Sequence, residues 1–535
     1  MTTAPVPSLP LDTGAAHARE SAWIIEPFIE GTREDYARLR EALGAAGYTQ
    51  EGLCDRLGLA SVYDFRQVRE GRPLVESLDD AQAVLTRLFL DAETVPWTVV
   101  RARLGEVLPA LERLGLVHTP HTRPDECAAT VLLYPTEGLW IVSDANADPD
   151  ALKVPPPPDV VYPAITRNTQ RFVGLMPRER CRRFLELCSG TGIAALLAAR
   201  DFAEHAWAVD ITARATRFAR FNAALNAIEN FTALEGDLWA PVAGLTFDRI
   251  VAHPPYMPSF ETAYVFRDGG EDGEQISRRI ITGLPDFLEP GGDFYADCLA
   301  TDRVDAPLEQ RLRAMLGAAE GEFDVVLAQA QTYDPTMYYA NLAKEKGTGW
   351  ELVGRRQAAF ARLGVERLVF GAMLLHRHVP REQPRPAATA RRQLHPFTQA
   401  ADFRWLHRWA ATTAEWGTDG RQVLLDAKPR VSPHVQVRMT QRNRDGEWVV
   451  DGCALSTPLP FAVDANCPAW FPALLLRCDG ARTGRELLAW LKAGEFVAPD
   501  ATEAQLGELL EGLLVQGFLE VDECPIPVRE LPAER

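Results

Sequence analysis

The stretch Arg183–Arg200, RFLELCSGTGIAALLAAR, decides the fold of this chain. An apolar run, two glycines and an alanine- and leucine-rich run follow one another, which predicts a strand, a tight turn and a helix. Glycines in such a turn let the backbone approach a ligand closely, and the helix N-terminus favours a negative group such as a carboxylate. The dinucleotide-binding fingerprint would need a third glycine, but Ala195 stands at that position.

The order of strand and helix repeats from Val160 to about Val379. The apolar runs are RFLELC, AWAVDI, FTALEGD, FDRIVAH, GDFYADCLA, FDVVLAQAQ and ERLVFGAMLLHRH. Alternation of this kind implies crossover connections and a sheet covered on both faces. We therefore predict an α/β domain with a seven-stranded, mostly parallel, Rossmann-like sheet.

Acidic residues stand at the tips of the first three strands. Glu186 ends the first, Asp210 ends the second in AWAVDIT, and Asp237 ends the third in LEGDLW. A carboxylate at the second tip can accept both hydroxyls of a ribose, and one at the third can accept an adenine amino group. The fourth strand runs into a stiff turn, VAHPPYMPS, over residues 251–259. Ligands of open parallel sheets bind at these carboxyl ends, so we expect one binding site there.

This combination resembles the class I S-adenosylmethionine-dependent methyltransferases, over the stretch from Tyr162 to Asp297. Within that class it looks most like the release-factor glutamine N-methyltransferase (HemK-like) group. The resemblance implies S-adenosylmethionine as the cofactor, with the glycine turn holding its methionine part. The implied cofactor site comprises Thr169, Glu186, Ser189, Gly190, Thr191, Gly192, Asp210, Asp237, Leu238 and His253.

The substrate motif of that family, asparagine (or aspartate)-Pro-Pro-Tyr, falls on His253-Pro254-Pro255-Tyr256. The resemblance implies that residue 253 and the Pro254 carbonyl accept hydrogen bonds from the target group, while the Tyr256 ring stacks on it. We take His253, Pro254 and Tyr256 as the candidate catalytic residues. A neutral imidazole has one acceptor and one donor, and it can also take a proton near pH 7. The histidine therefore widens the candidate acceptors to amines, hydroxyls, carboxyls and imidazoles, and a plain turn residue is the alternative.

Four prolines, Pro155 to Pro158, mark a domain boundary because they cannot continue a helix. We expect a disordered tail over 1–20, a helical or winged-helix-like domain over 21–150, the methyltransferase domain over 151–380, a linker over 381–395, and an α+β winged-helix-like domain over 396–535. The first flanking domain should end in a hairpin within CAATVLLYPTEGLWIVSD. The C-terminal domain is similar to the peptide-binding fold of the pyrroloquinoline-quinone precursor chaperone, which implies peptide binding; a structural cap is the alternative.

Charge and composition narrow the function classes. The net charge of −18 over 535 residues disfavours nucleic-acid binding, because the surface repels phosphate backbones. The leading hypothesis is methyl transfer to a nitrogen, or an oxygen, of a protein, peptide or small molecule. An RNA or tRNA base methyltransferase is one alternative, kept open by the arginine-rich stretch from Arg377 to His395. A non-catalytic cofactor-binding regulator is another, since the family's asparagine is absent.

Several observations concern location and further sites. No apolar run approaches the roughly 18 residues of a membrane span, and the nine scattered cysteines contain no C-x-x-C pair. We therefore expect a cytoplasmic protein without a metal or membrane partner, and the oligomeric state stays open. Tyr333, Tyr338 and Tyr339 follow the sixth strand and are candidates for the edge of the pocket, with surface packing as the alternative.

Overall fold

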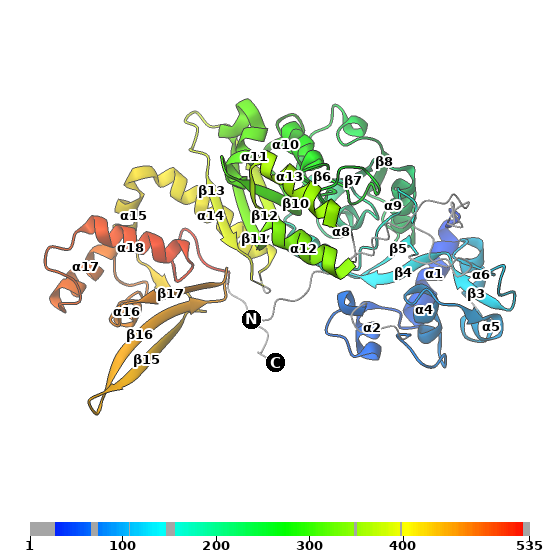
Figure 1. Ribbon diagram of the computed structural model, residues 1–535, viewed down its shortest axis with the longest axis horizontal. Coiled ribbons are helices and arrows are strands. Elements are labelled where there is room, and N and C mark those ends of the chain that lie inside the picture. Colours follow the sequence, from blue (N-terminus) through cyan, green and yellow to red (C-terminus); the bar gives the residue numbers. More distant parts are fainter. Residues whose placement is uncertain are drawn as a thin grey trace.

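The computed structural model describes residues 27–65, 73–105, 107–145, 156–346, 350–395 and 398–527 (Figure 1). The predicted tail over 1–20 lies outside these ranges. A central α/β domain separates two flanking parts, which we call the N-terminal module (residues 27–145) and the C-terminal module (residues 398–527). No helix in the described ranges is both long and apolar enough to cross a lipid bilayer.

An eight-stranded sheet forms the centre of the molecule, in the order β13-β11-β12-β10-β9-β6-β7-β8. Its strands are β6 (Cys181–Leu187), β7 (Ala203–Asp210), β8 (Phe231–Glu235), β9 (Phe247–Ala252), β10 (Leu288–Arg303), β11 (Phe323–Tyr333), β12 (Val365–Arg377) and β13 (Thr389–Gln393). The strands β6 to β10 pair in parallel, and β12 runs antiparallel between β10 and β11. The α/β fold predicted from the sequence is confirmed.

The predicted number of seven strands is wrong, because β13 adds an eighth. This strand pairs in parallel with β11 and lies within the segment predicted to be a linker. Its sequence, TARRQ, has little β-propensity, so its conformation follows from the backbone bonds that β11 offers rather than from its own residues.

Alternate side chains of the strands belong to two separate apolar cores. Phe184, Ala206 and Val251 pack into one core, and their neighbours Leu185 and Ile250 pack into the other. The first core also takes in α7 (Arg167–Leu175), α8 (Ile193–Asp201) and α9 (Ala213–Leu225). The second takes in α10 (Gln275–Phe287) and α11 (Leu308–Leu316). Burial on both faces explains why the strands read as continuous apolar runs.

A helical hairpin is inserted between β11 and β12. It consists of α12 (Pro335–Lys346) and α13 (Trp350–Leu363). Tyr339 and Phe360, one from each helix, pack with Leu299 and Leu368 in a small core of their own. The insertion therefore covers the edge of the sheet where β10 and β11 end and β12 begins.

The N-terminal module combines short helices with two small sheets. It contains α1 (Arg33–Ala45), α2 (Gln50–Leu57), η1 (Val62–Asp64), α4 (Ala81–Phe89), β1 (Val95–Pro96), α5 (Trp97–Leu104), α6 (Leu108–Arg113), β2 (Val117–His118) and β3 (Glu126–Ala129). The predicted hairpin is present as β4 (Val131–Thr136) and β5 (Leu139–Asp144). Its turn residues, Glu137 and Gly138, have φ values of 51° and 72°, as a tight two-residue hairpin turn requires.

Two asparagines on α9 attach this module to the central domain. Asn222 donates to the Val142 carbonyl and accepts from the Val142 N–H, so its carboxamide pairs with β5 as a strand would. Asn226, four residues later, makes the same pair of bonds with Trp140. The outer edge of β5 is thereby satisfied by side chains of a helix, and the hairpin is fixed against α9.

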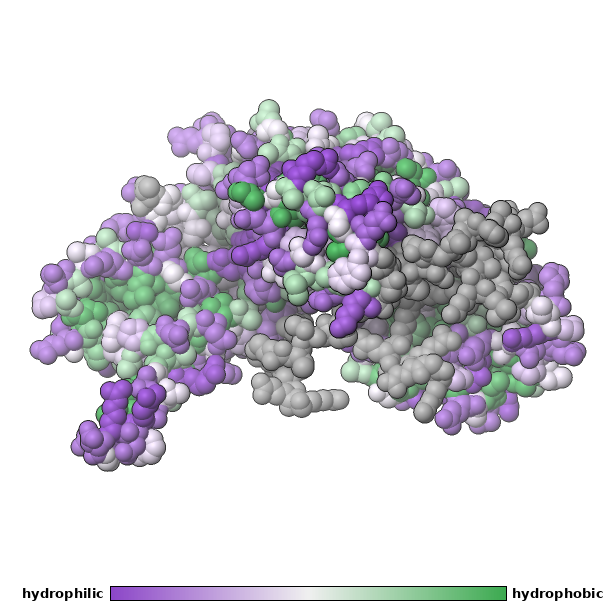
Figure 2. Space-filling model, viewed as in Figure 1, coloured by the Kyte–Doolittle hydropathy of each residue, from purple (hydrophilic) through white to green (hydrophobic). Residues whose placement is uncertain are grey.

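The C-terminal module begins with α14 (Ala400–Trp416), which packs across β11, β13 and α7. It continues with η4 (Gly417–Asp419), α15 (Gly420–Asp426), β14 (Arg430–Val431), β15 (Gln436–Arg444), β16 (Glu447–Thr457), β17 (Val463–Cys467), α16 (Phe471–Leu475), α17 (Gly484–Ala493), α18 (Glu503–Val515) and β18 (Leu519–Glu520). The β15–β16 ribbon projects from the body of the molecule, and its tip is mostly hydrophilic (Figures 1 and 2).

Candidate active site

One cavity of about 1210 Å³ lies beyond the carboxyl ends of β6, β7, β8 and β9. It collects nearly all the residues that the sequence analysis selected: Thr169, Glu186, Ser189, Gly190, Thr191, Asp210, Asp237, Leu238, His253, Pro254 and Tyr256. Gly192 alone of that set does not line it. Residues separated by up to 87 positions in the sequence thus meet at one edge of the sheet, as parallel strands require.

The glycine turn leaves an open cradle on one side and is closely packed on the other. Gly190 has φ of +52°, and a Cβ at this residue would have no atom within 4 Å. Gly192 has φ of +78°, and a Cβ there would lie 3.1 Å from that of Ala219. Gly190 therefore faces the cavity, whereas Gly192 serves the close approach of the turn to α9.

Glu186 secures this turn rather than pointing a free carboxylate at a ligand. The side chain is fully buried and accepts hydrogen bonds from the Ala194 and Ala195 N–H groups, at 3.4 and 2.8 Å, in the first turn of α8. Burial raises the pKa of the Glu186 carboxyl to about 8. Beside it, Ser189 Oγ is buried and has no hydrogen-bond partner among the described residues.

Asp210 links the second strand tip to the glycine turn. Its carboxylate accepts from the Gly190 N–H at 2.9 Å and from the Thr212 N–H at 3.0 Å. Burial raises the pKa of this carboxyl. The next residue, Ile211, lines the cavity with 53% of its surface exposed.

The third strand tip presents an acid with a partner. Asp237 forms an ion pair with Arg279 on α10, with 2.7 Å between Oδ2 and the guanidinium, and about half of its side chain is exposed. Leu238 is buried with φ of +50°. Ile211 and Leu238 give this part of the cavity apolar walls.

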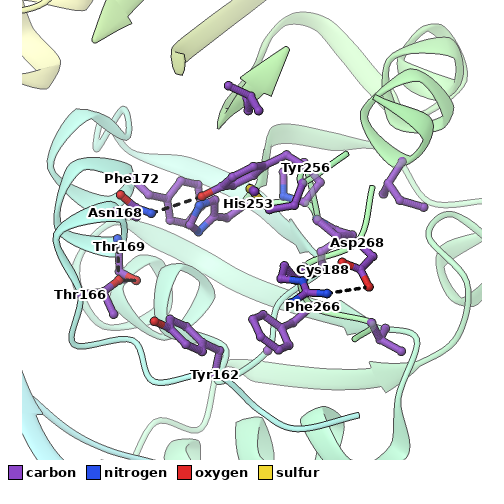
Figure 3. Close-up of a pocket in the computed structure, with 18 of the residues that line it drawn as sticks. Tyr162, Thr166, Asn168, Thr169, Phe172, Cys188, His253, Tyr256, Phe266 and Asp268 are labelled. Atoms are coloured by element: carbon purple, nitrogen blue, oxygen red, sulfur yellow. Dashed lines mark hydrogen bonds and ion pairs between the residues drawn. The ribbon is translucent and has the colours of Figure 1, made fainter. Parts of the chain in front are cut away.

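The His-Pro-Pro-Tyr turn begins directly after β9, at the centre of the cavity (Figure 3). The His253 ring stacks on Phe172 with 5.2 Å between centroids and 23° between planes. Its Nε2 is buried without a hydrogen-bond partner among the described residues. Burial, followed by the positive charge of Arg171, lowers the pKa of His253 to about 4. The imidazole is therefore neutral at pH 7.

Sequence reasoning missed two residues on α7. Asn168 Nδ2 donates to the Tyr256 hydroxyl at 3.2 Å, and Phe172 supports the His253 ring. Both line the cavity, and both point toward the His-Pro-Pro-Tyr turn in Figure 3. Their partners are more than 80 positions away, so only the fold brings them together.

Aromatic side chains also enclose the cavity elsewhere. Tyr162 and Phe266 stack with 5.1 Å between centroids and 11° between planes. Tyr333 and Tyr338 line the cavity, as one of the two interpretations from the sequence predicted. Tyr339 is instead buried against Phe360.

The residues around the turn fit the implied cofactor. S-adenosylmethionine, a sulfonium nucleoside, needs a close backbone approach, polar partners for its carboxylate and ribose, and apolar walls for its base. Gly190 offers the approach, Ser189 Oγ and Asp210 offer polar partners, and Ile211 offers exposed apolar surface. For metals, no group of three or more His, Cys, Asp or Glu side chains in the described ranges is arranged to hold an ion.

Comparisons with known proteins agree with this arrangement. Residues 163–331 match the family model described as the methyltransferase small domain. A Methanocaldococcus jannaschii protein, provisionally named a protein N5-glutamine methyltransferase, is 38% identical over 114 residues, which cover 20% of this chain and 57% of that protein. A release factor glutamine methyltransferase of Thermodesulfovibrio yellowstonii is 32% identical over 127 residues, which cover 22% of this chain and 46% of that protein. The chain spans about half the length of these curated relatives.

Among solved structures, a methyltransferase from Pyrococcus furiosus aligns at 19% identity over 44% of this chain and 90% of that one, with a TM-score of 0.27. The family model thus matches the part of the chain that runs from just before α7 to within β11. The similarity to the glutamine methyltransferases that the sequence motifs indicate is confirmed.

Proposed function

We propose that this chain transfers a methyl group from S-adenosylmethionine to a nitrogen atom of a protein. The observation that carries the proposal is the single cavity that holds the glycine turn, Asp210 and the His-Pro-Pro-Tyr turn together. The relatives at 38% and 32% identity are named as glutamine methyltransferases, which supports a protein nitrogen as the acceptor.

In this proposal, different residues hold different parts of the cofactor. Ser189 Oγ and the amides of the glycine turn hold the methionine carboxylate, and Asp210 accepts from the ribose hydroxyls. Ile211 and Leu238 enclose the adenine, and Asp237 accepts from its amino group. When bound, the cofactor supplies an electrophilic methyl group, so the protein needs no strong base to activate the acceptor.

His253 acts as a hydrogen-bond acceptor in this reaction. Its pKa of about 4 keeps the ring neutral at pH 7, so one ring nitrogen is available to accept an N–H. Together with the Pro254 carbonyl it orients the acceptor nitrogen, while the Tyr256 ring supports the planar group to which that nitrogen belongs. Orientation of this kind is worth up to roughly 7–11 kcal/mol of a barrier in favourable cases.

The flanking modules are accessory domains in the proposal. Winged-helix character for the N-terminal module is supported by the element order α4-β1-α5-α6-β2-β3 and the sheet order β1-β3-β2. In the C-terminal module, three consecutive antiparallel strands precede α16, α17 and α18. We propose that these modules select and hold the protein substrate while the central domain carries out the transfer.

Calorimetry tests the cofactor assignment. S-adenosylmethionine should bind the wild type, and Asp210→Ala should weaken binding by roughly tenfold or more, because a buried charged hydrogen-bond partner is lost. Asp464→Ala is the matched control, since this acid lies exposed on β17 and far from the cavity. Equal affinity for wild type and Asp210→Ala would contradict the ribose assignment.

Labelling tests the acceptor class. Radioactive methyl transfer to a cell lysate, separated into protein, RNA and small-molecule fractions, should place the label in protein. Label confined to RNA would instead support the base-methyltransferase alternative, and no label at all would support a cofactor-binding regulator.

Substitution of His253 tests its role. His253→Asn should retain turnover, because a carboxamide oxygen also accepts an N–H, and His253→Ala should lose between about tenfold and hundredfold in kcat. The wild-type rate should show no inflection between about pH 6 and 8, because the pKa of His253 lies near 4. An inflection assigned to His253 in that range would favour a proton-transfer role.

A further inference from the structure

The helix α7 holds both rings of the His-Pro-Pro-Tyr turn from one face. Asn168 and Phe172 are four residues apart, so their side chains lie on the same side of the helix. Asn168 donates to the Tyr256 hydroxyl at 3.2 Å, and Phe172 stacks on His253. Each residue thus contacts one of the two rings that would face a methyl acceptor (Figure 3).

The contact between Phe172 and His253 is part of a longer aromatic stack. On its other side, Phe172 lies against Tyr295 of β10, with 5.6 Å between centroids and 20° between planes. Phe172 and Tyr295 are both buried. An imidazole can turn about its terminal torsion over a broad range, so a flat, immobile neighbour is what defines its plane.

The helix itself is firmly fixed in the central domain. Thr166 caps its N-terminus by accepting from the Thr169 N–H. Arg171 forms an ion pair with the buried Asp297 of β10 at 2.8 Å, and its guanidinium lies 4.1 Å from the centre of the Phe370 ring. The support for His253 and Tyr256 is therefore anchored to two strands at the centre of the sheet.

We propose that Asn168 and Phe172 are positioning residues for methyl transfer, which set the orientations of the Tyr256 and His253 rings toward the acceptor. This inference rests on the proposed function. According to this inference, α7, which precedes β6 in the sequence, sets the geometry of the acceptor site. A phenylalanine at residue 172 suits a histidine at residue 253, because its flat face can stack on the imidazole.

Two variants test the proposal in the full chain. Phe172→Leu removes the flat face, and Asn168→Leu removes the hydrogen bond to Tyr256. In the lysate-labelling assay at saturating S-adenosylmethionine, each should lower the initial rate of protein labelling by between about tenfold and hundredfold, because misplacement of reacting groups affects the transition state most. Affinity for S-adenosylmethionine should stay within about twofold, because neither side chain is assigned to the cofactor.

Nuclear magnetic resonance provides a readout that does not depend on turnover. The His253 ring protons, assigned from the His253→Asn spectrum, lie over the Phe172 ring and should move downfield in Phe172→Leu, where the ring current is lost. Asn168→Gln should recover part of the activity that Asn168→Leu loses, because its carboxamide can still donate to Tyr256. Val173→Ala is the control for a general loss of packing, since Val173 is fully buried on α7 and does not line the cavity.

The outcomes separate this inference from the proposed function. A wild-type chain that neither binds S-adenosylmethionine nor labels protein overturns the proposed function, and the inference with it. A wild type that labels protein, with Phe172→Leu and Asn168→Leu equally active or no worse than Val173→Ala, overturns the positioning role alone. Unchanged His253 signals in Phe172→Leu also overturn the role of Phe172.

Discussion

The N-terminal module joins the central domain through neutral hydrogen bonds, aromatic packing and the buried ion pair of Asp144 with Arg214, whereas the C-terminal module joins it through clusters of charged groups around the buried Asp293 and Asp324. On the first side, Asn222 and Asn226 bind β5, and Phe28 packs on Phe218 and Phe221. On the second, Asp293 accepts from Arg404, and Asp324 accepts from His407 and Arg385. The two attachments therefore respond differently to substitution, oxidation and pH.

The acids of the second attachment lie at the beginnings of β10 and β11, at the edge of the sheet away from the cavity. His376 and Arg249 add further contacts to Asp293, and His378 adds one to Asp324. Both carboxylates are buried. Buried ion pairs contribute little when intact but are costly to break on one side, so this attachment is sensitive to loss of a single partner.

The largest effect is expected from Asp324→Ala. It would leave Arg385, His378 and His407 without their common acceptor, and breaking a buried pair in this way costs about 3–5 kcal/mol. Denaturant unfolding should show this loss. Glu511→Ala is the control, because Glu511 pairs with Arg421 at the surface and should change stability by about 0.5 kcal/mol at most. A loss below 1 kcal/mol for Asp324→Ala would show that water replaces the carboxylate without cost.

A somewhat smaller effect is expected from Asn222→Ala on the other side. The change removes bonds to Val142 N–H, Val142 C=O and Thr191 C=O, all of them buried, and should cost about 3 kcal/mol. Hydrogen exchange should rise in β4 and β5 while α14 stays protected. Asn230→Ala is the control. Asn230 directly precedes β8, and its side chain also donates to backbone carbonyls, those of Ala199 and Glu204, but it is only partly buried and does not contact the hairpin. Equal hydrogen exchange in the β4–β5 hairpin of Asn222→Ala and Asn230→Ala would contradict the role of Asn222 as a strand-like partner of β5.

Oxidation is expected to stabilise the C-terminal module alone. Cys453 of β16 and Cys467 of β17 are direct partners across the strands, with 3.4 Å between their sulfur atoms. Oxidised glutathione should convert the two thiols to a disulfide, releasing two molecules of reduced glutathione. Closing so short a loop should add about 2 kcal/mol to the unfolding of this module. Intact-mass measurement should detect the disulfide, and Cys453→Ser, which cannot form it, is the control. Persistence of both free thiols in the wild type would contradict the expected geometry.

Mild acid is expected to have the smallest effect, with opposite signs on the two sides. Burial by itself raises the pKa of Asp324, but hydrogen bonds from His407 and Arg385 hold that pKa far below its usual range. The stability that the carboxylate contributes is therefore present above about pH 4 and is lost as the pH falls further. Burial raises the pKa of Asp144, which belongs to the N-terminal module and pairs with Arg214 of α9, so protonation of Asp144 removes a penalty. Between pH 7 and 5 the change should stay below about 1 kcal/mol.

Limited proteolysis as a function of pH would measure this difference. The C-terminal module should become susceptible first as the pH falls below about 4. Earlier cleavage in the N-terminal module would contradict the assignment of the two attachments.

The sequence predicts the central sheet and most of the cavity because their signals are local. The glycine turn, the strand-tip acids and the His-Pro-Pro-Tyr turn each lie within a few residues of an apolar run, and the order of strands then brings them together. The contacts of Asn168 and Phe172 could not be predicted, because they depend on how α7 docks. The pair Asn222 and Asn226, four residues apart in the stretch FNAALNA at the C-terminal end of α9, is a signal that could have indicated a buried polar partner.

The insertion of α12 and α13 has a consequence for how acceptor choice can change. Its two ends leave the sheet next to each other, since Tyr333 at the end of β11 pairs with Leu368 near the start of β12. A loop closed by neighbouring antiparallel strands can lengthen, shorten or be exchanged without altering strand order. Because Met337, Tyr338 and Asn341 on α12 line the cavity, a change in the length or sequence of this insertion would reshape the cavity and leave the strands that carry the glycine turn in place.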